Sequence, residues 1–314
     1  MKYLVTGGAG FIGSNIVSEL LRQGQQVVVL DNFATGKREN ILPLMKNPNL
    51  TMIEGDLRSF HIVRSAVKGV DYILHQGALP SVPRSINDPI TSNDVNILGM
   101  LNILEAAKEF GVKRVITASS SSIYGNSETL PKVETMPVNP LSPYALTKYA
   151  QERYCQIFSQ IYGLETVALR YFNVFGPNQD PTSQYSAVIP KFIKLIMADK
   201  EPVIYGDGSQ SRDFTFVENN VWANIQACTA PKAAGEVINI ACGERYTLID
   251  LVNMINEILG KNIEPKFEKD RAGDVKHSLA GVDKAKDLLG YEVKVDFKWG
   301  LERTIEHFRP TSSR

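Results

Sequence analysis

Residues 3–13, Y-L-V-T-G-G-A-G-F-I-G, place a short apolar strand directly before a glycine-rich turn. A helical pattern follows to Arg22, with apolar residues spaced to form one buried face. Gly7 would allow the tight turn, Gly10 would let backbone N–H groups approach a phosphate, and Gly13 would let the helix pack closely on the strand. Both spacings, Gly8-x-Gly10-x-x-Gly13 and Gly7-x-x-Gly10-x-x-Gly13, are satisfied. The stretch therefore predicts a dinucleotide site at a helix N-terminus.

Asp31 closes the second predicted strand and indicates which dinucleotide binds. A carboxylate there can accept both hydroxyls of an adenosine ribose and would repel a 2′-phosphate, which favours NAD over NADP. Lys37 and Arg38 are the neighbours that could instead attract a 2′-phosphate. The predicted cofactor site comprises Gly7, Gly10, Phe11, Ile12, Gly13, Asp31, Asn32, Gly36, Asp56, Leu57, Gln76, Ala78, Tyr144, Lys148 and Tyr171.

Short β-branched runs alternate with helical segments over the first half of the chain. Strands are predicted at 3–6, 27–30, 50–54, 72–74, 115–118 and 166–169, and helices at 13–22, 95–110 and 143–162. This order predicts an α/β fold, a Rossmann-type doubly wound parallel sheet buried on both faces. Ligands of such a sheet bind at the carboxyl ends of its strands.

The pattern changes after about residue 172. A loop rich in Pro, Gly, Asn and Ser spans 173–186, and helices are predicted at 188–197, 248–259 and 282–289. We therefore expect an NAD-binding Rossmann domain over 1–172 and a smaller, mainly substrate-binding C-terminal lobe over 173–314. A segment near 212–241 is expected to return to the sheet.

Composition narrows the possible partners. The 314 residues carry 34 Lys+Arg and 34 Asp+Glu, so no net charge favours nucleic acid or an anionic membrane. Three cysteines without a CxxC pair and four scattered histidines predict neither a disulfide framework nor a metal site. There is no run of 18 apolar residues and no signal-peptide pattern, so a cytoplasmic protein is expected.

Two polar motifs follow predicted strands or start helices. In S-P-Y-A-L-T-K (142–148), Ser142 is a predicted N-cap, and Tyr144 and Lys148 share one helix face. A nearby ammonium and a cationic nicotinamide would both favour the Tyr144 phenolate, so the tyrosine is a plausible general base. The serine run S-S-S-S-I-Y-G (119–125) follows a predicted strand and places hydroxyls at its carboxyl end.

With these motifs the chain resembles extended short-chain dehydrogenases/reductases of the nucleotide-sugar epimerase family over almost its whole length. Further shared motifs are R-Y-F-N-V-F-G-P (170–177), S-R-D-F (211–214) and R-A-G-D (271–274). The resemblance is nearest to UDP-hexose 4-epimerases, above all the branch acting on UDP-N-acetylglucosamine. It implies a homodimer formed through a four-helix bundle from the helices near 95–110 and 144–162.

The resemblance also implies residue roles. Ser120 would hydrogen-bond the sugar O4, Tyr144 would remove its proton as hydride passes to NAD, and Lys148 would hold the nicotinamide ribose. The implied UDP-sugar site comprises Pro80, Ser81, Ser120, Ser121, Ser122, Tyr144, Asn173, Ala187, Val188, Tyr205, Arg212, Arg271, Asp274 and Ser278. Related dehydratases carry Thr-Asp-Glu where this chain has Ser120–Ser122, so dehydration is not expected.

Ser278 bears on the choice of substrate. In 4-epimerases restricted to UDP-glucose and UDP-galactose this position resembles a bulky tyrosine, whereas small residues accompany N-acetylated sugars. The resemblance therefore favours UDP-GlcNAc/UDP-GalNAc, with UDP-Glc/UDP-Gal as possible further substrates. The alternatives are a 4-epimerase restricted to non-acetylated sugars, another nucleotide-sugar epimerase or reductase, and a non-catalytic NAD sensor.

Overall fold

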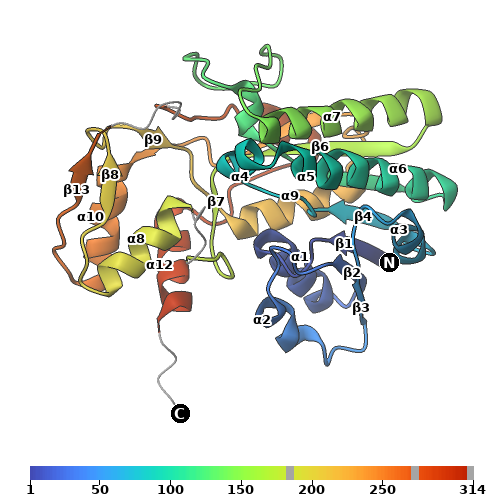
Figure 1. Ribbon diagram of the computed structural model, residues 1–314, viewed down its shortest axis with the longest axis horizontal. Coiled ribbons are helices and arrows are strands. Elements are labelled where there is room, and N and C mark those ends of the chain that lie inside the picture. Colours follow the sequence, from blue (N-terminus) through green and yellow to red (C-terminus); the bar gives the residue numbers. More distant parts are fainter. Residues whose placement is uncertain (182–186, 270–275, 310–314) are drawn as a thin grey trace.

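The computed structural model describes residues 1–181, 187–269 and 276–309. Its centre is a seven-stranded parallel sheet with the strand order β11-β6-β5-β4-β1-β2-β3 (Figure 1). The strands are β1 (Lys2–Thr6), β2 (Gln26–Asp31), β3 (Leu50–Glu54), β4 (Tyr72–His75), β5 (Arg114–Ser120), β6 (Glu165–Tyr171) and β11 (Val237–Ile240). The predicted doubly wound α/β fold is confirmed, and β11 adds an edge strand from the second half of the chain.

Helices cover both faces of this sheet because its strands are apolar on both sides. Val5 of β1 packs towards α1 (Phe11–Arg22) and α9 (Val217–Thr229), in the larger core cluster. The neighbouring Leu4 packs on the other face, with α3 (Phe60–Val67), α6 (Gly99–Glu109) and α7 (Pro143–Tyr162). Alternate side chains of one strand therefore supply two cores.

The helix expected at 95–110 is not a single regular α-helix. A π-helical turn, η2 (Asp94–Leu98), precedes α6, and two short helices, α4 (Val82–Asn87) and α5 (Pro89–Asn93), lie before it. The short helices α2 (Arg38–Ile41) and η1 (Leu42–Leu44) follow β2.

The C-terminal lobe lies to one side of the sheet (Figure 1). Its helices are α8 (Val188–Met197), α10 (Leu248–Leu259) and α12 (Phe297–Phe308), whereas α11 (Asp283–Leu289) packs against β11 and α9 of the sheet. Its short strand pairs are β8 (Val203–Tyr205) with β13 (Lys266–Glu268), and β9 (Ser211–Arg212) with β12 (Tyr246–Thr247). The loop predicted at 173–186 contains a further strand, β7 (Val174–Phe175), which pairs with β10 (Thr215–Phe216).

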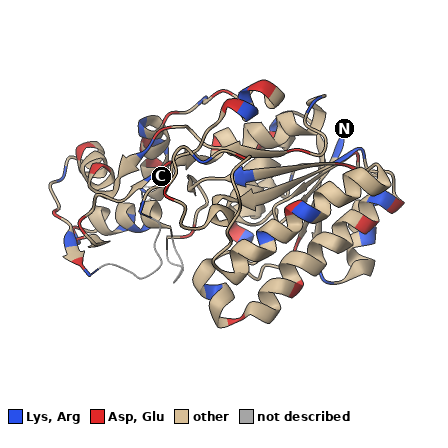
Figure 2. Ribbon diagram, turned by 90° about the horizontal axis from the view of Figure 1, so that it is seen from above, with Lys and Arg blue, Asp and Glu red and all other residues tan. Residues whose placement is uncertain are grey.

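Aromatic side chains join the lobe to the rest of the core. The Phe175 ring contacts Phe216 and Phe297 at centroid distances of 5.6 and 5.5 Å, and Phe214 stacks on Phe297 at 5.3 Å. Positive and negative residues are interspersed on the outer helices (Figure 2). No described helix is both long and apolar enough to cross a membrane.

Candidate active site

A cavity of about 1080 Å³ runs along the carboxyl ends of β1, β2, β4, β5 and β6. Segments far apart in the sequence meet there, since parallel strands all end at the same edge of the sheet. The predicted residues that line it are Gly7, Gly10, Phe11, Ile12, Gly13, Asp31, Asn32, Gly36, Asp56, Leu57, Gln76, Ala78, Pro80, Ser120, Ser121, Ser122, Tyr144, Lys148, Tyr171, Asn173, Arg212 and Ser278.

The remaining predicted residues lie elsewhere. A second cavity of about 300 Å³ is lined by Ala187, Val188 and Tyr205, and shares Asn173 and Arg212 with the first. Ser81 is not among the residues lining either cavity. Its hydroxyl instead caps α4 by accepting a hydrogen bond from the Arg84 backbone N–H at 3.3 Å. Arg271, an expected diphosphate ligand, and Asp274, an expected substrate-binding residue, lie outside the described residues.

The glycine turn holds α1 against β1 more closely than any side chain would allow. A Cβ on Gly13 would lie 2.1 Å from the Gly7 carbonyl oxygen, and Gly7 has a φ of +66°. The Gly10 N–H donates to the same oxygen at 3.0 Å. This geometry aims the N-terminus of α1 into the cavity, where its free N–H groups suit a pyrophosphate.

Asp31 is fixed from two sides at the end of β2. Its carboxylate accepts hydrogen bonds from the backbone N–H groups of Ala9 at 2.9 Å and Phe33 at 2.8 Å. Burial raises the Asp31 pKa, and these two hydrogen bonds act in the opposite direction. The carboxylate is thus fixed on the cavity wall, at the strand end where such folds bind an adenosine ribose.

The two basic residues that could favour NADP are engaged with carboxylates. Lys37 pairs with Asp180 at 3.0 Å, and Arg38 pairs with Glu54 at 2.8 Å. The Arg38 guanidinium also lies over the Phe33 ring, 3.9 Å from its centroid. Because both cations are paired and the Asp31 carboxylate would repel a 2′-phosphate, this part of the cavity fits NAD rather than NADP.

The residues after β3 and β4 are held by hydrogen bonds from their neighbours. The Asp56 carboxylate accepts from Arg58 and from Asn32, and these contacts lower its pKa to about 2. Gln76 donates to the Asn224 side-chain oxygen at 3.0 Å and accepts from the Tyr171 hydroxyl at 3.2 Å. Both polar groups are therefore pre-oriented along the cavity wall.

Ser142 starts α7 as predicted, because its hydroxyl accepts a hydrogen bond from the Ala145 N–H at 3.1 Å. Tyr144 follows on the first turn, and a hydrogen bond joins its hydroxyl to Ser120. Lys148, one turn further, donates from Nζ to the Ala118 carbonyl at 2.7 Å. The strand end of β5 and the first two turns of α7 thus bring together the three predicted catalytic residues.

The electrostatics at Tyr144 differ from the sequence-based expectation. Burial raises its pKa, and only the hydrogen bond with Ser120 acts to lower it. Lys148 Nζ lies 6.0 Å from the centre of the tyrosine ring and is bound to a carbonyl. The net effect of the protein's own residues is therefore a raised Tyr144 pKa, and a further positive charge beside the phenol would be needed to favour the phenolate.

The far wall of the cavity comes from the C-terminal half of the chain. Asn173 donates from Nδ2 to the Asp213 carbonyl at 3.1 Å and to the Ser278 hydroxyl at 3.4 Å. Lys132 and His277 also line the cavity, and neither was predicted. Both lie in segments without a strand-end or glycine signal, so only the folded chain reveals their position.

Comparisons with known proteins agree with this geometry. The model of the NAD dependent epimerase/dehydratase family matches residues 3–241. The chain belongs to this family. It is 35% identical to the UDP-glucose 4-epimerase of Mycolicibacterium smegmatis, over 99% of this chain and 100% of that protein.

Solved structures extend the similarity. The UDP-N-acetylglucosamine 4-epimerase of Methanobrevibacter ruminantium M1, in complex with UDP-N-acetylmuramic acid, is 42% identical with a TM-score of 0.94, covering 98% of this chain and 97% of that one. The UDP-glucose 4-epimerase of Thermus thermophilus, in complex with NAD, is 37% identical with a TM-score of 0.89, covering 99% and 100%. The activity that these comparisons support is NAD-dependent 4-epimerisation of a UDP-sugar.

Proposed function

We propose that this 4-epimerase interconverts UDP-GlcNAc and UDP-GalNAc, and that UDP-Glc and UDP-Gal are further substrates. The observation that carries the proposal is Ser278, a small side chain on the cavity wall that also includes Ser120–Ser122 and Tyr144. A small residue there leaves volume for the acetamido group at C2. A pocket with room for the acetamido group does not require that group to be present, so the non-acetylated sugars also fit.

In the proposed reaction, Tyr144 accepts the proton of the sugar O4 and later returns it. Ser120 holds O4 by a hydrogen bond, and its own oxygen accepts a hydrogen bond from the Ser122 hydroxyl at 2.9 Å. When bound, the dinucleotide supplies the hydride acceptor and donor at C4. No net proton or hydride is gained or lost in one turnover, which is what an epimerisation requires.

Arg212 and Asn173 are proposed to hold the diphosphate. They line both cavities, and therefore lie where a nucleoside in the smaller cavity would join a sugar in the larger one. Arg212 is itself held by donating to the carbonyls of Ser211 and Lys276, both at 3.1 Å. A planar guanidinium in a fixed place suits phosphate oxygens.

The test is an NMR assay of the purified protein, without added NAD, on UDP-GlcNAc, UDP-Glc and UDP-glucuronate together. Formation of UDP-GalNAc supports the proposal, and UDP-Gal as the only product would sink the acetamido assignment. Ser278→Tyr should reduce UDP-GalNAc formation about 10- to 200-fold, the range of 1–3 kcal/mol for a group in a tight pocket, and spare UDP-Gal formation. Ser278→Ala, the control, should retain both activities.

We also propose a homodimer built on the face of α4, α5, η2 and α7. This face exposes Ile86, Ile90, Leu98 and Leu146, with Ile90 74% and Ile86 61% accessible. Apolar residues gathered on neighbouring helices are typical of a subunit interface. Sedimentation of a species at only 34.8 kDa would contradict the dimer.

A further inference from the structure

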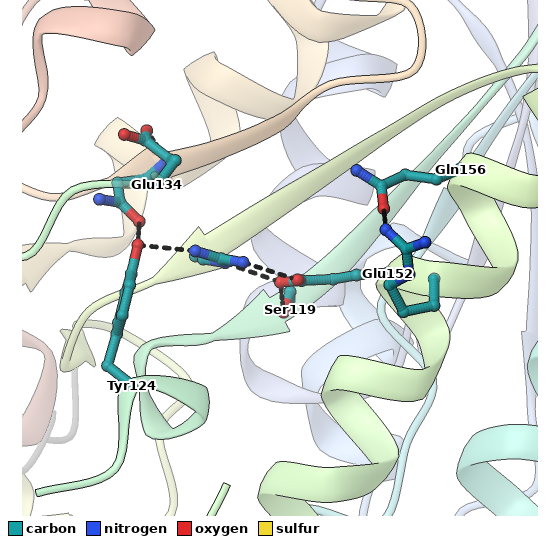
Figure 3. A network of polar contacts seen from close by, with 8 residues as sticks. Ser119, Tyr124, Glu134, Glu152 and Gln156 are labelled. Carbon is teal, nitrogen blue, oxygen red and sulfur yellow. Dashed lines mark hydrogen bonds and ion pairs between the residues drawn. The ribbon is translucent and has the colours of Figure 1, made fainter. Parts of the chain in front are cut away.

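A buried ion pair joins α7, which carries Tyr144 and Lys148, to β6 (Figure 3). Glu152 of α7 and Arg170 of β6 have side chains that are only 1% and 5% exposed. Two hydrogen bonds join them, each 2.9 Å long, from Nε and Nη2 of the guanidinium to the two carboxylate oxygens. Neither residue lines either cavity, so the pair does not contact the substrate.

Glu152 attaches α7 to the end of β5 together with Lys148. Lys148 donates to the Ala118 carbonyl at 2.7 Å, and one helical turn later Glu152 accepts a hydrogen bond from the Ser119 hydroxyl. The next residue of β5 is Ser120. Successive turns of one helix are thus bound to successive residues of the strand that ends at the catalytic serine.

The network continues past the serine run. Arg170 donates from Nη1 to the Tyr124 hydroxyl at 2.8 Å, and Tyr124 donates to the Asn239 side-chain oxygen at 2.8 Å (Figure 3). Tyr124 ends η3 (Ser121–Tyr124). The segment from Ser119 to Tyr124 is therefore held at both ends by the same buried pair.

The charge of Glu152 also bears on Lys148. Burial lowers the Lys148 pKa to about 8, and the Glu152 carboxylate acts in the opposite direction. Tyr144 on α7, whose ring centre lies 6.0 Å from Nζ, and a neutral His75 on β4 also face this ammonium. Among the described residues, Glu152 is the carboxylate whose charge raises the Lys148 pKa.

We propose that Glu152 is a positioning residue for epimerisation, which holds the Lys148 ammonium and the Ser120 end of β5 in place for the reaction. The inference rests on the roles proposed above for Ser120, Tyr144 and Lys148. A carboxylate is needed rather than an amide, because an amide would leave the buried Arg170 without a negative partner and Lys148 beside an unbalanced positive charge.

The test compares Glu152→Gln with a matched control, Glu165→Gln. Glu165 pairs with the buried Arg114 at 2.6 Å, at the opposite end of the same two strands. Both variants therefore remove the carboxylate partner of a buried arginine at one end of these strands, but only Glu152 lies next to the proposed site. Glu152→Asp keeps the charge and serves as the conservative rescue.

The first measurement is the pH profile of kcat and KM with the best UDP-sugar. Glu152→Gln should move the alkaline limb of kcat at least one pH unit lower and cost 10-fold or more at pH 8, while KM changes less than threefold. Glu152→Asp should restore the limb, and Glu165→Gln should leave it unchanged. An unshifted limb in Glu152→Gln, or the same shift in Glu165→Gln, would overturn the inference.

A second measurement needs no activity. In protein with ¹³C-labelled lysine, NMR can follow the titration of Lys148, assigned by its loss in Lys148→Met. Its midpoint should fall in Glu152→Gln and stay in Glu165→Gln. An unmoved midpoint defeats the inference even if the wild type is a 4-epimerase. A wild type without epimerase activity on any UDP-hexose defeats the proposed function, whatever the midpoint does.

Discussion

Replacing Gly13 with alanine tests whether the turn between β1 and α1 holds the dinucleotide. The new Cβ would lie 2.1 Å from the Gly7 carbonyl oxygen and 2.9 Å from the Gly8 Cα. Non-bonded heavy atoms favour separations of roughly 3.5 Å, so the start of α1 must move away by about 1.4 Å. The atoms nearest to the new Cβ all belong to the backbone, so the clash cannot be relieved by moving a flexible side chain.

A shift of that size exceeds the tolerance of a hydrogen bond. Each N–H bond to a charged phosphate is worth about 1.5–3 kcal/mol, and a displaced helix N-terminus would lose about two of them. The expected loss is therefore about 3–6 kcal/mol, or roughly 10²- to 10⁴-fold in NAD affinity. Overpacking should also lower the free energy of unfolding by about 1–3 kcal/mol.

Calorimetric titration with NAD measures the affinity, and urea unfolding measures the stability. Gly24→Ala is the control at the other end of the same helix, where φ is +72° but no atom lies within 4 Å of the new Cβ. It should lower stability through backbone strain and leave NAD affinity unchanged. The reasoning fails if Gly13→Ala binds NAD within threefold of the wild type, or if Gly24→Ala weakens NAD binding equally.

Two further predictions concern proton-binding groups. Tyr144→Phe removes the proposed proton acceptor and should lower kcat by about 10²- to 10⁴-fold while NAD and UDP-sugar still bind, as titrations would show. Retained turnover would refute its role as the base. Burial, together with the nearby charge of Lys148, lowers the pKa of His75 to about 3. Because the unfolded chain then binds a proton below about pH 6.5 that the native protein does not, stability should fall by about 2–3 kcal/mol between pH 6.5 and 4.5. Measured by urea unfolding, His75→Asn should remove most of this fall in stability, whereas the exposed His61→Asn should not. An equal dependence of the unfolding free energy on pH in both variants would count against assigning the fall to His75.

The sequence predicts the sheet well because its signals are local. Each strand is a short apolar run, and the turn at Gly7–Gly13 depends on contacts within a few residues, so periodicity and glycine spacing suffice. The strand ends then place Asp31 and Ser120 at one edge without further information. Even the start of α7 follows from a local capping residue.

The charged partners of the site residues could not be predicted from the sequence, because they come together only in the folded chain. Lys37 gives no sign in the sequence that Asp180 will pair with it. The pKa of Tyr144 likewise depends on burial, which spacing along one helix does not report. The four-residue interval from Tyr144 to Lys148 predicted a shared face correctly, but the ammonium binds the Ala118 carbonyl.

Arg114 of β5 pairs with Glu165 of β6, and Arg170 of β6 pairs with Glu152 of α7; comparing the two pairs shows why the buried one calls for a functional explanation. At the amino ends of the strands, Glu165 is 50% exposed, so its charge keeps much of its hydration. At the carboxyl ends, both Glu152 and Arg170 are almost fully buried. Burying two charges costs several kcal/mol per ion, and apolar residues of similar volume often stabilise a fold as well or better. Stability alone therefore does not account for this pair, and the positioning role that we propose for Glu152 offers an explanation.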